Sequence, residues 1–219
     1  MNGIFSLKGK TAVVTGAFGL IGREICKVLS DYGAYVAMCD IDFKKTKIIS
    51  NKNSLSIELD VTNIDSIKAA NKKILQQTGT IDVLINSAAV NDTFSSDKSV
   101  LEQSKFENYS DVLWEKSIDV NLTGTYLCCK IFGSEMAKQK SGSIINVAST
   151  YGLVGPNQSL YIDNRGQQMF YKSPSYPASK GAIINFTKYL AAYWGKESVR
   201  VNTLCPGGVE DSQDKNFIK

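Results

Sequence analysis

Tyr176 and Lys180 lie four positions apart in the segment "SPSYPASKG" (173–181), where a polar stretch with two prolines runs into an apolar helical pattern. In a helix, this spacing places both side chains on one face. A free phenol titrates at about 10, which is too high for a base at neutral pH, and a neighbouring ammonium favours the phenolate. The pair therefore fits a proton-transfer site. A surface pair at helical spacing is the alternative interpretation of this motif alone.

A second candidate is the glycine-rich segment "TGAFGLIG" (15–22), which connects a β-branched stretch to a helical pattern. Gly16, Gly19 and Gly22 follow a G-x-x-G-x-x-G spacing, with Leu20 and Ile21 between the last two. Glycines allow a tight turn and close approach of a pyrophosphate, and the following helix offers unpaired N–H groups and the positive end of its dipole. The segment predicts dinucleotide binding, and a simple glycine turn is the alternative.

Asp40 stands 18 positions after Gly22, at the end of the next predicted strand. This is about the ~20-residue spacing at which an acidic residue binds the adenosine ribose hydroxyls. A carboxylate accepts hydrogen bonds from a 2′-hydroxyl and repels a 2′-phosphate, so Asp40 favours NAD over NADP. Arg23 is a counter-signal, because it is placed to meet a phosphate. The alternative role for Asp40 is to cap a short helix at 42–49.

Strands and helices are predicted to alternate along the chain, with strands that are apolar on both faces. The predicted strands cover 10–15, 34–40, 54–60, 80–89, 142–149 and 199–208, and the predicted helices cover 20–33, 63–79, 110–139 and 175–195. This order predicts an α/β fold, a doubly wound parallel sheet of the Rossmann type in three α/β/α layers. Two polar stretches, 90–108 and 152–174, each follow a strand and are candidate walls of a substrate site.

Composition excludes several classes of function. The 219 residues fit a single domain over 1–219, and the net charge of +4 is scattered, which argues against nucleic-acid binding. With five cysteines in no CxxC pair and no histidine, we expect reduced thiols, no metal site, and no Ser-His or Cys-His catalytic pair. The sequence shows no signal peptide and no membrane-spanning run, so we expect a cytoplasmic protein.

Seven motifs make the chain resemble the short-chain dehydrogenase/reductase family over almost its whole length. In chain order they are "TGAFGLIG" (15–22), "LDV" (59–61), "NSAA" (86–89), "NLTG" (121–124), "NVASTYG" (146–152), "YPASK" (176–180) and "PGG" (206–208). The resemblance implies hydride transfer between NAD or NADP and a carbonyl or secondary alcohol. It also favours the catalytic interpretation of the tyrosine–lysine pair.

The resemblance implies a role for each catalytic residue. Tyr176 would be the general acid/base, and Lys180 would stabilise its phenolate and bind the nicotinamide ribose. Ser149 would hold the substrate oxygen, and Asn121 would support a water that relays protons to Lys180.

Other matching positions would bind the cofactor beside the glycine turn. Asp60 and Val61 would border the adenine, and Asn86 and Ala88 would lie near the adenosine ribose. Along the nicotinamide, the resemblance places Pro206, Gly207 and Val209.

Three features depart from the family pattern. The glycine spacing is nearer that of long members that modify nucleotide sugars. Ser149 and Tyr176 are separated by an inserted "PNQSLYIDNRGQQMFYKS" (156–173), whose tyrosines and amides suit a polyhydroxylated substrate. The chain ends ten residues after Val209, so we expect it to lack the family's usual C-terminal lid and last strand.

These features most resemble oxidoreductases of bacterial surface-sugar and flagellin-modification clusters, so a sugar derivative is the expected substrate. The alternatives are a nucleotide-sugar epimerase or dehydratase, and a truncated NAD-binding protein without turnover.

The helices at 110–139 and 175–195 carry apolar or aromatic residues nearly all round. A helix that covers one sheet face needs a single apolar stripe. These two helices form the dimer interface in the family that the chain resembles, so we expect a homodimer or homotetramer through them. A tight cover by neighbouring loops is the alternative.

Overall fold

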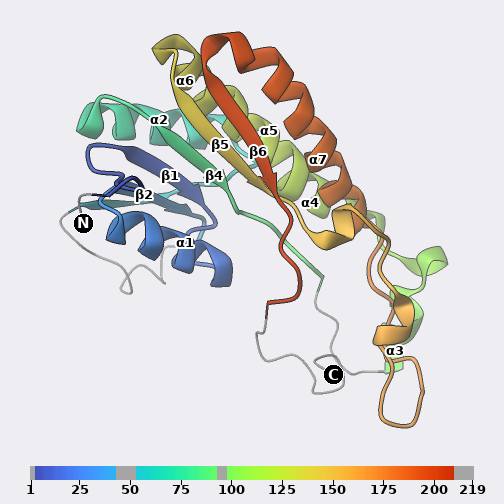
Figure 1. Ribbon diagram of the computed structural model, residues 1–219. Helices are drawn as coiled ribbons and strands as arrows, with labels where there is room; N and C mark the ends of the chain where they lie inside the picture. The colour runs from blue at the N-terminus through green and yellow to red at the C-terminus, as the bar shows by residue number, and fades with distance from the viewer. Residues whose placement is uncertain (1–2, 43–52, 93–97, 210–219) are drawn as a thin grey trace.

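The computed structural model describes residues 3–42, 53–92 and 98–209. Its centre is a six-stranded parallel sheet in the order β3-β2-β1-β4-β5-β6 (Figure 1). The strands are β1 (Thr11–Thr15), β2 (Tyr35–Asp40), β3 (Ser54–Glu58), β4 (Val83–Asn86), β5 (Gly142–Val147) and β6 (Val199–Leu204). This is the doubly wound order, in which the direction of winding reverses between β1 and β4. The predicted fold class is confirmed.

Two hydrophobic layers cover the sheet. Helix α1 (Leu20–Asp31) packs on one face through Cys26, beside Val14 and Val36 of the strands. The other face is buried under α2 (Ile64–Thr78), α5 (Gly124–Cys128), α6 (Ser134–Gln139) and α7 (Ser175–Trp194). The strands are buried on both sides, which explains their continuous apolar runs. None of the described helices has the length and apolarity needed to span a membrane.

The predicted helix at 110–139 is helical throughout, but it is not uniform. It comprises α4 (Asp111–Ile118), a π-helical segment (Asp119–Thr123), α5, a second π-helical segment (Cys129–Gly133) and α6. The single predicted helix therefore contains two local widenings, of the kind that often occur at functional sites. The first of them contains Asn121.

Some predicted boundaries were wrong. The stretch 90–108, in which no helix was predicted, contains α3 (Lys98–Ser104) and a 3₁₀ turn (Phe106–Asn108). The strands predicted at 80–89 and 199–208 end at Asn86 and Leu204, because the backbone leaves the sheet to form the loops of the site. The short helix predicted at 42–49 lies outside the described residues, apart from Asp42.

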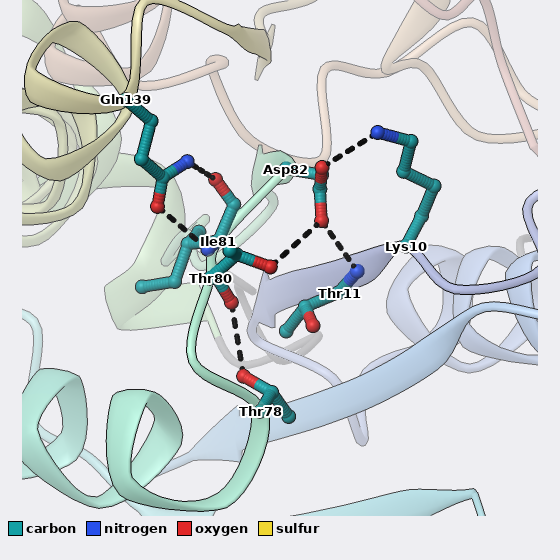
Figure 2. A network of polar contacts seen from close by, with 7 residues as sticks. All are labelled: Lys10, Thr11, Thr78, Thr80, Ile81, Asp82 and Gln139. Carbon is teal, nitrogen blue, oxygen red and sulfur yellow. Dashed lines mark hydrogen bonds and ion pairs between the residues drawn. The ribbon is translucent and has the colours of Figure 1, made fainter.

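At the amino ends of the strands, a polar network joins β1 to β4 (Figure 2). The Asp82 carboxylate accepts hydrogen bonds from the Lys10 ammonium at 2.8 Å and from the Thr11 backbone N–H at 2.9 Å. The Gln139 side chain pairs with both backbone groups of Ile81, accepting from the N–H at 3.1 Å and donating to the carbonyl at 2.9 Å. These contacts hold the start of β4 against β1 and the end of α6.

Candidate active site

The glycine-rich turn lies at the carboxyl end of β1, where the winding of the sheet reverses. Gly16 has a φ of +62°, and a β-carbon on it would lie 2.7 Å from Cα of Ala88 in the neighbouring loop. A β-carbon on Gly22 would lie 2.0 Å from the Gly16 carbonyl oxygen. No side chain caps α1 at Gly19, and its first turn contains no acidic residue. The turn therefore leaves the positive end of α1 open to an anionic group.

Asp40 ends β2 beside this turn. One of its carboxylate oxygens accepts a hydrogen bond from the backbone N–H of Phe18 at 2.9 Å, and the other accepts from Asp42 N–H at 3.0 Å. Each oxygen keeps a second lone pair for a ligand. Asp40 thus fixes the glycine turn and presents a carboxylate at the end of the strand. The helix that it was alternatively expected to cap lies outside the described residues.

The loop after β4 is attached to β1 by the Thr15 hydroxyl, which accepts hydrogen bonds from the N–H groups of Ser87 and Ala88, both at 3.2 Å. The Asn86 side chain points into the sheet, where its amide donates to Asn146 Oδ1 at 2.8 Å. Ala88 therefore supports the glycine turn by close backbone contact. Asn86 joins the ends of β4 and β5 through this buried hydrogen bond.

Ser149 and Tyr176 meet beyond the end of β5. Gly152 allows this approach, because a β-carbon there would lie 2.7 Å from the Lys180 backbone in α7. Burial raises the pKa of Tyr176, and a hydrogen bond with Ser149 acts in the opposite direction. The net pKa is raised, whereas we expected Lys180 to favour the phenolate. At neutral pH, Tyr176 is accordingly held as the protonated phenol, ready to donate.

Lys180 is 3% exposed, and its ammonium donates to the Val147 carbonyl at 2.7 Å. Its Nζ lies 5.7 Å from the centroid of the Tyr176 ring. Burial lowers the Lys180 pKa to about 8, with a smaller opposing effect from Cys205. The predicted pair is therefore adjacent, and its ammonium is anchored to the end of β5.

Asn121 is fully buried in the first π-helical segment. Its side-chain amide donates to the Val90 carbonyl at 3.0 Å and to Ser179 Oγ at 3.1 Å, and its Oδ1 accepts from Val90 N–H at 2.8 Å. Its backbone carbonyl accepts from the Thr125 hydroxyl at 2.8 Å. Asn121 thus ties the loop after β4 to the helix that carries Tyr176. The water relay expected through it stays a prediction.

A cavity of about 460 Å³ joins the glycine turn to the tyrosine–lysine pair. Many of the predicted site residues line it: Gly16, Gly19, Leu20, Ile21, Gly22, Ser149, Tyr176, Lys180, Pro206, Gly207 and Val209. Five further lining residues were not named as site residues, although Asn91 lies in the stretch 90–108 that was predicted to border the substrate: Ser87, Ala89, Asn91, Val147 and Ala148. Their position in the sequence could have identified them, because all five follow or end a strand at the carboxyl edge of the sheet.

The remaining predicted residues lie behind or beside this cavity: Asp40, Asp60, Val61, Asn86, Ala88 and Asn121. Asp60 accepts hydrogen bonds from the N–H and the hydroxyl of Thr62, at 2.9 and 2.7 Å. Val61 is buried against Gly124, where a β-carbon would lie 2.7 Å from its methyl group. In the described structure, Asp60 and Val61 hold the turn between β3 and α2.

Comparison with known proteins identifies the family. The family model described as enoyl-(acyl carrier protein) reductase matches residues 16–218. A 3-oxoacyl-[acyl-carrier-protein] reductase of Vibrio harveyi is 33% identical, over 96% of this chain and 78% of its own length. The chain belongs to the short-chain dehydrogenase/reductase family. This short-chain dehydrogenase/reductase is therefore an oxidoreductase, and the dehydrogenases of its family use NAD or NADP.

Two further relatives of this short-chain dehydrogenase/reductase extend the comparison. An NAD-dependent glycerol dehydrogenase of Listeria innocua is 33% identical, over 92% of this chain and 71% of its own length. The crystal structure of gox2181 superposes with a TM-score of 0.82 at 27% identity, covering 95% of this chain and 75% of that one. The likeness thus extends through the whole described sheet.

Proposed function

We propose that residues 1–219 form a single dinucleotide-binding domain that transfers a hydride between NAD and a carbonyl or secondary alcohol, with Tyr176 as general acid/base. The observation that carries the proposal is the convergence of Ser149, Tyr176 and Lys180 in one cavity with the glycine turn. Gly16 and Gly22 allow the close backbone packing of the turn, and the uncapped start of α1 that lines the cavity suits a bound pyrophosphate. When bound, the nicotinamide supplies or accepts the hydride.

The chain's own residues would handle the proton. The raised pKa of Tyr176 keeps its phenol protonated at neutral pH, so in the reducing direction it donates to the carbonyl oxygen of the substrate. Ser149, which lines the same cavity as Tyr176, would hold the same oxygen. Lys180, whose ammonium has further donors beyond its bond to Val147, would bind the nicotinamide ribose and stabilise the phenolate that forms.

Asp40 supports a preference for NAD over NADP. Its carboxylate ends β2 beside the glycine turn, where a 2′-phosphate would meet like charge. Titration of the protein with NADH and NADPH checks this, and tighter binding of NADPH would contradict it.

A polyhydroxylated substrate, such as a sugar derivative, is favoured by the segment 152–174. The segment carries amide and phenol groups, and the hydroxyl of its Tyr161 lies 2.9 Å from that of Tyr151, which follows the cavity residue Ser149 closely in sequence. The named activity of the Listeria relative, on glycerol, concerns a polyol.

We also propose association through α4 and α7. Large apolar or aromatic side chains remain exposed on these helices: Val112, Leu113 and Trp114 on α4, and Tyr189 and Tyr193 on α7. Such surfaces commonly mark interfaces. Sedimentation of the wild type and of Tyr193→Glu would test a homodimer or homotetramer. We expect the variant to have a lower mass than the wild type, and equal masses would contradict association through α7.

The proposed function is tested by Tyr176→Phe, which removes the proton donor and little surface. We expect hydride transfer to fall by about 10²–10⁴-fold, while the affinity for NADH is unchanged. Absorbance at the NADH band, with a panel of sugar phosphates and polyols, measures turnover, and fluorescence titration measures binding. Turnover by the variant within tenfold of the wild type would overturn the assignment of Tyr176.

A further inference from the structure

Lys172 brings a second ammonium group to the proposed acid/base. It lies near the end of the inserted segment, and its Nζ is 5.1 Å from the centroid of the Tyr176 ring, compared with 5.7 Å for Lys180. The same ammonium donates a hydrogen bond to Asn91 Oδ1. Asn91 and Tyr176 both line the cavity described above, so the Lys172 ammonium lies against two of its lining residues, while Lys172 itself lines a neighbouring cavity of about 280 Å³.

The backbone of Lys172 is held in place from both sides. Gln158 Oε1 accepts from the Lys172 N–H at 2.8 Å, and Gln158 Nε2 donates to the Lys172 carbonyl at 3.3 Å. The preceding N–H, of Tyr171, donates to the Ser104 hydroxyl at 3.0 Å. Ser104 is itself buried at the end of α3. The two polar segments after β4 and β5 therefore join to fix this lysine.

The charge of Lys172 is incompletely balanced. Burial lowers its pKa to about 8, and Asp92 raises it to a smaller extent. Asp92 already accepts a hydrogen bond from the Tyr109 hydroxyl. Among the residues that the structure describes, Lys172 forms no ion pair, and its hydrogen-bond acceptor is the neutral amide of Asn91. A partly buried ammonium in this setting is stabilised by an incoming anion.

We propose that Lys172 binds an oxyanion of the substrate, a carboxylate or a phosphate, and so selects anionic alcohols or carbonyl compounds over neutral ones. The inference rests on the proposed function, because it places the reacting oxygen of the substrate at Tyr176. An oxyanion on the Lys172 ammonium then belongs to the same substrate molecule, because Lys172 Nζ is 5.1 Å from the centroid of the Tyr176 ring. Lys172 thus distinguishes this site from one for an uncharged polyol.

Binding of simple anions tests the inference without knowledge of the substrate. The NAD-saturated protein is titrated with acetate, acetamide and inorganic phosphate, with binding followed by ligand-observed NMR. NAD occupies the glycine turn, so phosphate cannot report on that site. We expect acetate or phosphate to bind and acetamide not to bind. The tighter of the two anions indicates whether the substrate carries a carboxylate or a phosphate.

Three variants assign the binding to Lys172. Lys172→Met and Lys172→Gln are expected to weaken anion binding at least tenfold, and Lys172→Arg, which keeps the charge, is expected to stay within about threefold of the wild type. The control is Lys188→Met, which removes an exposed lysine of α7 and is expected to leave anion binding unchanged. Thermal unfolding shows which variants are folded. If one of the two neutral variants, Lys172→Met or Lys172→Gln, does not fold, the other still tests the role of Lys172.

Each result separates this inference from the proposed function. Anion binding that is absent in the wild type, or that survives in the neutral variants, overturns the role of Lys172. If the wild type does not bind NADH, that result would instead contradict the proposed function. NADH is therefore titrated on the same samples.

Discussion

The charged side chains at the two ends of the parallel sheet have different kinds of partners. At the amino ends, the Asp82 carboxylate has a cation, Lys10, and a backbone N–H as partners. At the carboxyl ends, Lys180 is buried and Lys172 is partly buried, and both donate to neutral acceptors. Paired charge at one end stabilises the strands, whereas the other end keeps cations with free donors. Under the proposed function, the second arrangement costs stability and is retained for binding.

The largest expected difference between the two ends of the sheet is in the effect of replacing a glycine with alanine. A β-carbon on Gly22, in the nucleotide turn, would lie 2.0 Å from the Gly16 carbonyl oxygen, whereas one on Gly79 would meet nothing within 4 Å. We expect Gly22→Ala to lower the free energy of unfolding by about 3 kcal/mol and to abolish detectable NADH binding, because the turn must open. Gly79→Ala, at a left-handed helix end, should cost about 1 kcal/mol and leave NADH binding intact. Urea unfolding and fluorescence titration measure both effects, and equal NADH affinities would remove the contrast.

Lys180→Met should have the next largest effect. It removes the buried ammonium near Tyr176, so we expect turnover to fall by about 10²-fold. NADH binding should weaken as well, because the ammonium is the proposed ribose ligand. Stability should not fall in parallel, since an apolar side chain replaces a buried cation whose pKa is lowered to about 8. Lys188→Met is the matched control on the same helix. A variant that loses stability but keeps its turnover would assign Lys180 a structural role.

At the amino ends, Asp82→Ala should show the reverse pattern. The Thr11 N–H and the Lys10 ammonium lose their acceptor, and Asp82 is largely buried, with a side chain 14% exposed. We expect the free energy of unfolding to fall by about 2 kcal/mol, with turnover and NADH affinity unchanged. Asp65→Ala provides the comparison, because Asp65 forms an ion pair with Lys68 on the exposed surface of α2. A loss of turnover in Asp82→Ala, without unfolding, would show that the two ends are coupled.

The sequence predicted the fold, the glycine turn and the tyrosine–lysine pair from local signals, and the resemblance to the family supplied further lining residues such as Ser149 and Pro206. Periodicity located the strands, and parallel strands bring their carboxyl ends to one edge, so residues following them, such as Ser149, converge. The side-chain orientation of Asn86 could not be predicted in this way. It depends on the hydrogen bond to Asn146, which lies 60 positions away in sequence.

The position of Lys172 was missed for a related reason. The inserted segment has no periodic pattern, and its course is set by side-chain contacts such as those of Gln158 with the backbone. We had expected Lys180 to favour the phenolate of Tyr176, but burial raises the Tyr176 pKa instead. The sequence reveals the nearby lysine but not how deeply the tyrosine is buried. Distances and burial depend on tertiary packing, which motif spacing does not specify.

The smallest expected effect belongs to Lys10→Met, which separates the ion pair from the backbone contact within the amino-end network. Lys10 is half exposed, with 50% of its side chain accessible, so its attraction to Asp82 is reduced by water. Asp82 keeps its bond to the Thr11 N–H in this variant. We therefore expect the free energy of unfolding to fall by about 0.5 kcal/mol, well below the loss in Asp82→Ala. The difference should shrink further at ~1 M salt, where the screening length is about 3 Å. Urea unfolding at low and high salt measures it. A loss as large as that of Asp82→Ala would mean that the cation, rather than the backbone contact, holds β1 to β4.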